Sequence, residues 1–117
     1  MMHSFVNAQV YLALGATDMR KAINTLSIVV EGQMRHNPLS GSLFAFCNRK
    51  RDIIKILQWD KNGFCLFEKR LEKGRFSWPE SSEEVMALTH RELGWLINGM
   101  PIPFFSAGSE RSCVSMI

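Results

Sequence analysis

The chain has 117 residues, of which 46% are hydrophobic and 21% charged, the proportions of one ordinary globular domain. Its three cysteines are an odd number, and no stretch approaches the roughly 20 apolar residues of a membrane span. We therefore expect neither a disulfide scaffold nor a membrane protein. The first residues lack the pattern of a signal peptide, so a cytoplasmic protein with reduced thiols is expected.

The first predicted elements are a short strand and a long helix. Residues 9–14 (QVYLAL) are β-prone and end at Gly15, which predicts the strand. Thr17 is the expected N-cap of the helix, and Asp18 complements its positive end. Pro38 cannot continue a helix, so the helix ends before it. Apolar residues at helical spacing are Met19, Ala22, Ile23, Leu26, Val30 and Met34.

Residues 43–78 contain three apolar β-type runs separated by two turn signals. The runs cover about 43–47, 53–59 and 64–71, and the turns cover 48–51 and 60–63, which predicts an antiparallel meander. Apolar residues do not alternate cleanly along the runs, so both faces of the sheet are expected to be covered. With Gly63 in the second turn, two registers are open, placing Lys55 opposite either Lys69 or Arg70.

The remaining elements are short. A fourth strand is expected over 75–78, stopped by Pro79, and residues 81–84 read as a polar loop. Thr89 and Glu92 have the spacing of a capping box, which predicts a helix over 90–98 with Gly99 as its C-terminal cap. Periodicity disappears after Pro101. We expect a single domain over 1–100 and an irregular tail over 101–117.

These elements predict an α+β fold. The antiparallel sheet has four or five strands, the long helix packs on one face, and the short C-terminal helix lies at the edge or end of the sheet. Among the aromatic residues of the meander, most are expected in the core, because a small domain has few other large side chains to bury. Any that are exposed could stack on nucleic-acid bases.

Charge is concentrated in the meander. Between Arg49 and Arg75 there are nine Lys or Arg and four Asp or Glu, although the whole chain carries only +3. This polarity favours a polyanionic partner, nucleic acid first among them. The alternative is a solvated face whose cations protect edge strands from aggregation. The candidate nucleic-acid-binding residues are Arg20, Lys21, Arg49, Lys50, Arg51, Lys55, Lys69, Arg70, Lys73 and Arg75.

Two positions sharpen this hypothesis. In both open registers Lys55 faces another cation, which is destabilising, so Lys55→Glu is expected to leave stability unchanged or raised while weakening phosphate binding. Arg20 and Lys21 fall in the first turn of the predicted helix. Cations oppose the helix dipole there, while the free N–H groups favour an anion. Salt bridges to nearby acids are the alternative for both.

No catalytic residue, metal site or cofactor is predicted. Cys47, Cys65 and the scattered histidines lack metal-ligand spacing, and the two thiols sit in apolar runs typical of the core. There is no glycine-rich phosphate loop. The acids of the meander alternate with cations, as solvated surface pairs do. They are Asp52, Asp60, Glu68 and Glu72.

Several motifs carry a resemblance to a known family. They are Thr17-Asp18-Met19-Arg20-Lys21, Gly41-x-Leu43-Phe44-x-Phe46, Arg51-Asp52-x-Ile54-Lys55-x-Leu57-x-Trp59-Asp60, and Lys69-Arg70-Leu71-Glu72-x-Gly74-Arg75-Phe76-x-Trp78-Pro79. In order and spacing, over about residues 10–99, the chain resembles the TnpB accessory proteins of insertion-sequence family sixty-six, products of the second open reading frame. The resemblance implies a small bacterial protein that supports transposition alongside a separate, larger transposase. Nuclease activity does not follow, because the RNA-guided nucleases that share the name are much longer and do not resemble this chain.

The resemblance and the charge pattern lead to one expected function and one alternative. We expect a non-catalytic accessory protein of transposition whose partners are DNA and the transposase, with no membrane partner and no sequence signal for oligomeric state. The alternative is a protein adaptor that contacts the transposase without touching DNA. The relatives continue after the second helix with a basic Trp-Arg-Arg type segment, whereas residues 100–117 hold one arginine, so no phosphate contact is expected from this tail.

Overall fold

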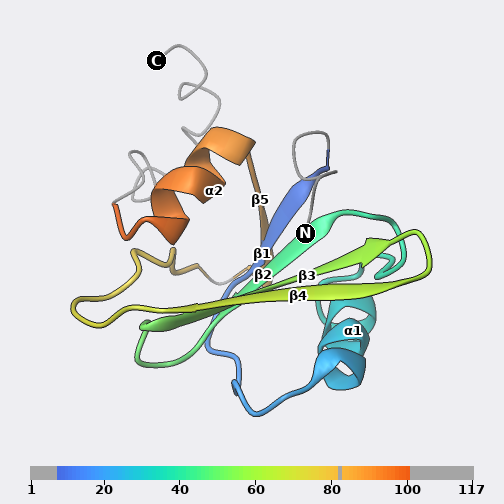
Figure 1. The fold of residues 1–117 in the computed structure, drawn as a ribbon, viewed down its shortest axis with the longest axis horizontal. Helices are drawn as coiled ribbons and strands as arrows, with labels where there is room; N and C mark the ends of the chain where they lie inside the picture. Colours follow the sequence, from blue (N-terminus) through green and yellow to red (C-terminus); the bar gives the residue numbers. More distant parts are fainter. Residues whose placement is uncertain (1–7, 82, 101–117) are drawn as a thin grey trace.

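A computed structural model describes residues 8–81 and 83–100 of the chain. The predicted tail over 101–117, with Cys113, lies outside the described residues. Five strands form one sheet in the order β4-β3-β2-β1-β5 (Figure 1). The elements are β1 (Val10–Ala13), α1 (Ile23–Gly32), β2 (Leu43–Cys47), β3 (Ile53–Asp60), β4 (Gly63–Arg70), β5 (Val85–Leu88) and α2 (His90–Ile97).

The sheet is mixed, so the expectation of an antiparallel sheet is correct only in part. β2, β3 and β4 form the predicted antiparallel meander. β1 is parallel to β2, with Val10 opposite Leu43, because α1 crosses over between the two strands and returns the chain in the same direction. β5 adds an antiparallel strand on the other side of β1. α1 and α2 are both short, with ten and eight residues.

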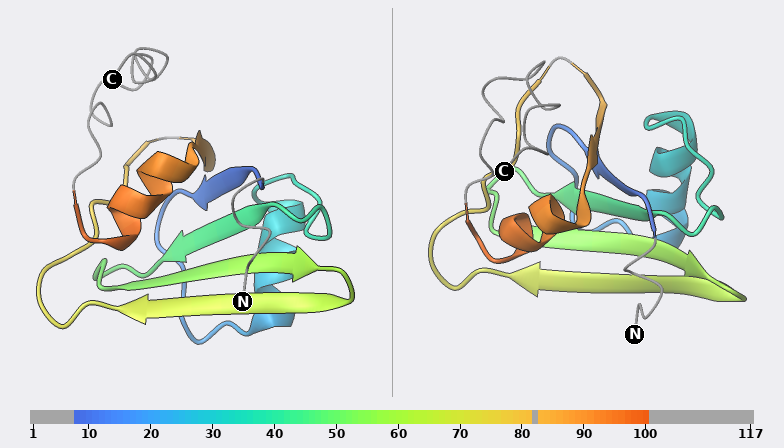
Figure 2. Two further views of the ribbon diagram at one scale, coloured as in Figure 1. Left: turned by 45° about the horizontal axis from the view of Figure 1, so that its top comes forward. Right: turned by 90° about the horizontal axis from the view of Figure 1, so that it is seen from above.

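The two helices cover opposite faces of the sheet (Figures 1 and 2). Under α1, Leu26 and Val30 pack with Phe44 and Phe46 of β2. Under α2, Leu93 and Leu96 belong to a second cluster that includes Leu43, Ala45 and Cys47 of the same strand. All five residues of β2 are buried, which explains why its apolar residues do not alternate. Coverage of both faces is confirmed, but α2 lies on a face of the sheet and not at its edge.

α1 begins five residues later than predicted. Its N-cap is Ala22, which makes no side-chain capping bond, so the assignment of Thr17 as N-cap is wrong. The backbone N–H of Thr17 donates to the carbonyl oxygen of Cys47 at 2.8 Å. The Asp18 carboxylate accepts from the backbone N–H of Arg20 at 2.9 Å and so closes a local turn. Arg20 and Lys21 therefore lie in the loop before the helix and not in its first turn.

The register of the β3–β4 hairpin corrects both sequence alternatives. Asp60 pairs with Gly63, so the loop is Lys61-Asn62, and Lys61 takes the positive φ of 57°. Gly63 belongs to the strand. This shift places Lys55 opposite Glu68, with 3.8 Å between Nζ and Oε1. The expected pair of opposed cations does not exist, so Lys55→Glu would relieve no repulsion between neighbouring strands.

Residues 75–78 do not form the predicted fourth strand. The segment is irregular, and two hydrogen bonds hold it against the sheet. The backbone N–H of Phe76 donates to the carbonyl oxygen of Arg51 at 2.6 Å, and the indole N–H of Trp78 donates to the carbonyl oxygen of Ala13 at 3.0 Å. The fifth strand is β5, which was not predicted, because a run of only four apolar residues does not by itself distinguish a strand from other structure.

The capping box of the second helix is confirmed. The Thr89 hydroxyl accepts from the backbone N–H of Glu92 at 3.1 Å, and the Glu92 carboxylate accepts from the backbone N–H of Thr89 at 2.9 Å. The helix spans His90–Ile97, and Gly99 follows it with a φ of 76°, as a C-terminal glycine does.

Candidate nucleic-acid interface

Three segments that are distant in sequence bring cations to one end of the sheet. The β1–α1 loop, the β2–β3 turn and the end of β4 line a common pocket of about 400 Å³, to which Arg49, Lys50 and Arg70 contribute. The backbone N–H of Leu71 donates to the carbonyl oxygen of Asp52 at 2.8 Å, which holds the segment after β4 beside the turn. We call this region the basic end. It comprises Arg20, Lys21, Arg49, Lys50, Arg51, Arg70, Lys73 and Arg75.

Asn48 organises the turn that carries the central cations. Its side-chain oxygen accepts from the backbone N–H groups of Asp52 at 3.0 Å and Ile53 at 3.1 Å. Its side-chain amide donates to the Asp52 carboxylate at 2.7 Å. With these bonds in place, Arg51 takes the positive φ of 63°, and Arg49 and Lys50 are exposed at the tip. The turn was predicted from the sequence, but the side-chain hydrogen bonds by which Asn48 stabilises it were not.

Arg20 is exposed and already has an anionic partner. Its guanidinium donates to both oxygens of the Asp18 carboxylate at 2.8 to 3.1 Å. These hydrogen bonds lower the pKa of Asp18 to about 2. The two side chains are 91% and 42% exposed, and exposed ion pairs contribute little to stability. A phosphate could therefore replace this carboxylate at small cost.

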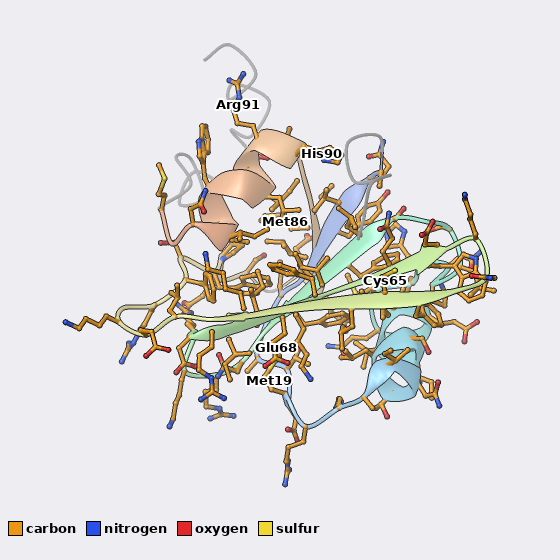
Figure 3. The ribbon with its side chains drawn as sticks, in the orientation of Figure 1. Met19, Cys65, Glu68, Met86, His90 and Arg91 are labelled. Carbon is orange, nitrogen blue, oxygen red and sulfur yellow. The ribbon has the colours of Figure 1, made fainter. Side chains whose placement is uncertain are left out.

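Lys55 is buried against the β1–α1 loop of the basic end, and its ammonium is bound to backbone carbonyls. The residue is 8% exposed, and its ammonium donates to the carbonyl oxygens of Met19 at 2.7 Å and Lys21 at 3.3 Å. Figure 3 shows Met19 and Glu68 on the same side of the sheet, on the α1 side. The ammonium of Lys55 therefore fixes the β1–α1 loop, and with it the position of Arg20.

Lys69 serves the other face of the sheet. Its ammonium donates to the carbonyl oxygen of Ile97 at 2.9 Å, at the C-terminal end of α2, where a cation is favourable. In two of the ten candidate residues, Lys55 and Lys69, the ammonium group thus donates a hydrogen bond to a backbone carbonyl oxygen. The sequence signal for Lys55 was its place between Ile54 and Ile56 in a strand whose two faces are both covered. No comparable signal marked Lys69.

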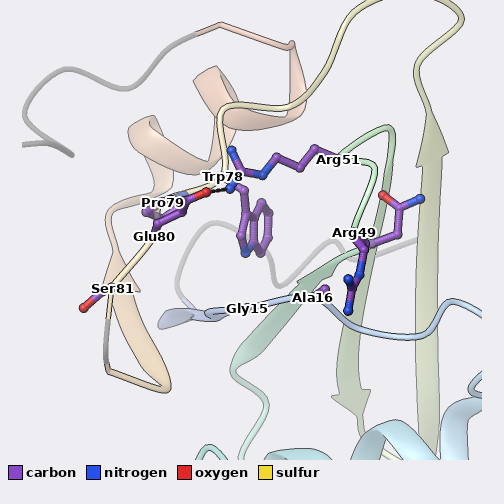
Figure 4. A pocket seen from close by; sticks show the side chains of 9 residues that line it. Gly15, Ala16, Arg49, Arg51, Trp78, Pro79, Glu80 and Ser81 are labelled. Carbon is purple, nitrogen blue, oxygen red and sulfur yellow. Dashed lines mark hydrogen bonds and ion pairs between the residues drawn. The ribbon is translucent and has the colours of Figure 1, made fainter.

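A second pocket, of about 320 Å³, opens on the Trp78–Ser81 side of the same turn. Arg49 and Arg51 contribute to its lining, together with Gly15, Trp78 and Glu80 (Figure 4). Arg51 reaches across to the carboxylate of Glu80 and forms an ion pair with it. The sequence pointed to Trp78 as part of a family motif but did not point to Glu80 or to this pocket, because the segment 76–81 approaches the turn only in the folded chain.

The cysteines and acids show no arrangement for catalysis within residues 8–81 and 83–100. Cys47 is buried and free, and burial raises the pKa of its thiol to about 12. Cys65 is half-buried and also free. No three His, Cys, Asp or Glu in this part of the chain are placed to hold a metal ion. Glu68 pairs with Lys55, and Asp52 is held by Asn48.

The aromatic residues divide into two groups. Phe44, Phe46, Phe76 and Trp78 are buried, as expected for the core. Trp59 and Phe64 are half-buried and contact each other edge to face, with 5.1 Å between ring centroids. This pair lies beside the Lys61-Asn62 loop, at the opposite end of the hairpin from the basic end.

Fold and site together define a small α+β domain with a mixed sheet and one cationic end. The chain belongs to the family of IS66 Orf2 like proteins, whose family model matches residues 8–105. This match confirms the resemblance to the accessory proteins of that insertion-sequence family and associates the chain with transposition in an accessory role. The family is not a known catalytic one. Within the described ranges, no helix is long and apolar enough to cross a membrane.

Two relatives come from Sinorhizobium fredii (strain NBRC 101917 / NGR234). The chain is 38% identical over 100 residues to uncharacterized protein y4hO, a match that covers 86% of this chain and 87% of the relative. It is 26% identical over 92 residues to uncharacterized protein y4jC, which covers 79% of each chain. No solved structure matches the chain.

Proposed function

We propose that the chain is a non-catalytic accessory protein of transposition that binds DNA, alone or in complex with the transposase, through the phosphate contacts of the basic end. The supporting observation is that two segments distant in sequence, the β2–β3 turn and the end of β4, place Arg49, Lys50 and Arg70 around one pocket. Lysines and arginines that neutralise phosphates release bound counterions, which gives sequence-independent affinity. Family membership supplies the setting of transposition.

The proposed DNA-binding surface contains eight of the ten candidate residues predicted from the sequence. Lys55 and Lys69 are left out, because their ammonium groups contact the carbonyl oxygens of Met19 and Ile97. The carboxylates at the basic end are Asp18, Asp52, Glu72 and Glu80. Asp18 and Glu80 pair with Arg20 and Arg51, and Asp52 is held by Asn48. Arg49, Lys50, Arg70, Lys73 and Arg75 are exposed, so their side chains can reach a phosphate chain.

The test compares two exposed lysines in the two hairpin turns, at opposite ends of β3. Binding to element-end DNA and to unrelated DNA is measured by fluorescence anisotropy at a series of salt concentrations, with and without transposase. Lys50→Gln should weaken binding and reduce the log–log salt slope by about one, because one phosphate contact is lost. Lys61→Gln is the matched control and should change neither.

Equal losses from Lys50→Gln and Lys61→Gln would place the binding surface elsewhere. Binding with a salt slope near zero would contradict phosphate recognition altogether, since counterion release is its signature.

The structure offers one observation in favour of the adaptor function. Among the described strands, β4 pairs only with β3, and its residues Phe64, Leu66 and Phe67 are half-buried. An edge strand of this kind can accept a further strand from a protein partner. Transposase binding that resists high salt, with no affinity for DNA in the isolated protein, would favour this second candidate.

A further inference from the structure

The second pocket lies at the carboxyl ends of the two parallel strands. Gly15 follows β1 and Asn48 follows β2, and both line it. In sheets with parallel strands, ligands bind outside the carboxyl ends. The segment Trp78–Ser81 closes the other side (Figure 4). The pocket is thus formed by three segments and differs from a flat charged surface.

Its walls leave room for a small ligand. The indole N–H of Trp78 is bound to the Ala13 carbonyl oxygen, and the residue is only 5% exposed, so it forms a fixed apolar wall. Gly15 has a φ of 90°, and no heavy atom lies within 4 Å of where a Cβ would be. The volume of about 320 Å³ is at the lower end of the range for small-molecule sites.

The polar groups of this pocket select an anion. Arg49 and Arg51 bring two guanidinium groups, whose planar forks match carboxylates and phosphates. Arg51 already holds the carboxylate of Glu80, whose side chain is 76% exposed on the segment that follows Pro79. Glu80 therefore places an anion at Arg51 in the free protein. Because the Glu80 side chain is exposed, a stronger anion can take the place of its carboxylate at small cost.

We propose that this pocket binds the terminal phosphate monoester of a nucleic-acid strand, which displaces the Glu80 carboxylate from Arg51. The proposal rests on the proposed function, since it names the part of DNA that this pocket takes. A pocket between two segments admits a strand end, whereas a continuous backbone passes over it. A terminal monoester carries up to two negative charges at neutral pH, with a second pKa near 6, and so competes better than an internal diester.

The experiment uses single-stranded oligonucleotides of one sequence that end in a 5′-phosphate, a 3′-phosphate or only hydroxyl groups. Affinity is measured by anisotropy with the full chain. The wild type should prefer one of the phosphorylated ends by about tenfold or more, the factor that one hydrogen bond to a charged group supplies. The preference should shrink between pH 7.5 and pH 5.5, because the monoester becomes protonated.

Two substitutions and one control separate a ligand site from a structural ion pair. Glu80→Gln should increase the preference for the phosphorylated end about threefold, because the competing carboxylate is gone. Arg51→Gln should abolish the preference, so that the phosphorylated and the hydroxyl-ended strands bind with equal affinity, whatever Arg51 contributes to the binding of both. Glu83→Gln changes an exposed carboxylate that does not line the pocket and should behave as wild type.

The outcomes distinguish this proposal from the proposed function. Equal affinity of the wild type for all three strands, with a steep salt dependence, would overturn the pocket proposal and leave DNA binding intact. No binding to any strand at low salt would overturn both. A lower melting temperature of Glu80→Gln without any gain in preference would show that the Arg51–Glu80 pair is structural, and would also overturn the proposal.

Discussion

The ammonium of Lys69 lies 2.9 Å from the carbonyl oxygen of Ile97, the last residue of α2. This bond joins the edge strand β4 to the helix on that face of the sheet. α2 has no basic residue of its own in its last turn. The sheet therefore supplies the cation that the negative end of a helix favours.

Replacing Lys69 should loosen α2. Lys69→Met keeps most of the aliphatic stem and removes the donor, and it should lower the free energy of unfolding by about 1 kcal/mol. Urea denaturation followed by circular dichroism measures this change. Lys73→Met, at an exposed loop position, is the control and should stay within about 0.5 kcal/mol of wild type. Equal stability of Lys69→Met and wild type would mean that the bond to Ile97 contributes nothing.

Lys55→Glu should destabilise the fold, in contrast to what the sequence alone suggested. The substitution would place a carboxylate beside Glu68 and the carbonyl oxygens of Met19 and Lys21, where Lys55 now donates. A buried charge without a compensating partner costs about 3 kcal/mol or more. Urea denaturation again provides the measurement, with Lys61→Glu in the exposed hairpin loop as the matched charge reversal. A Lys55→Glu protein as stable as Lys61→Glu would contradict the observed contacts.

Cys47 should be chemically inert in the folded protein. Its pKa is raised to about 12 by burial, so at pH 8 the thiolate that reacts with iodoacetamide is nearly absent. Peptide mapping after alkylation should find Cys47 unmodified in buffer and modified in urea, with the half-buried Cys65 as an internal reference. Modification of both thiols at one rate in the folded protein would contradict this prediction.

The same pKa shift has a consequence for stability. Above pH 9, near the ordinary pKa of a cysteine, the unfolded chain loses the Cys47 proton while the folded chain keeps it. The folded state then binds more protons than the unfolded state. The free energy of unfolding therefore falls as the pH rises from about 9 toward 12. Cys47→Ala should show a shallower decline over this range than wild type in pH-dependent urea titrations.

Local sequence patterns predicted those parts of the fold whose cause is local. The three strands of the meander, their turns and the α2 capping box are confirmed within one or two residues, because hydrophobic runs, Asn48 and the Thr89–Glu92 spacing act over a few residues. The register of the β3–β4 hairpin was wrong. It depends on Lys61 adopting a positive φ, a conformation usually assigned to glycine or asparagine.

The sequence by itself determined the family motifs, most of the strands, and the concentration of cations between Arg49 and Arg75. Only the tertiary structure decided which of these cations are free to meet a partner. Lys55 and Met19 are 36 positions apart, and Lys69 and Ile97 are 28 apart, so no local pattern reports either bond. A backbone carbonyl that loses contact with water on folding needs a hydrogen-bond donor. In the folded chain, Lys55 and Lys69 donate to the carbonyl oxygens of Met19 and Ile97. The tertiary structure also pairs Glu80 with Arg51 in an ion pair. It gathers other cations, among them Arg49, Lys50 and Arg70, at one end of the sheet.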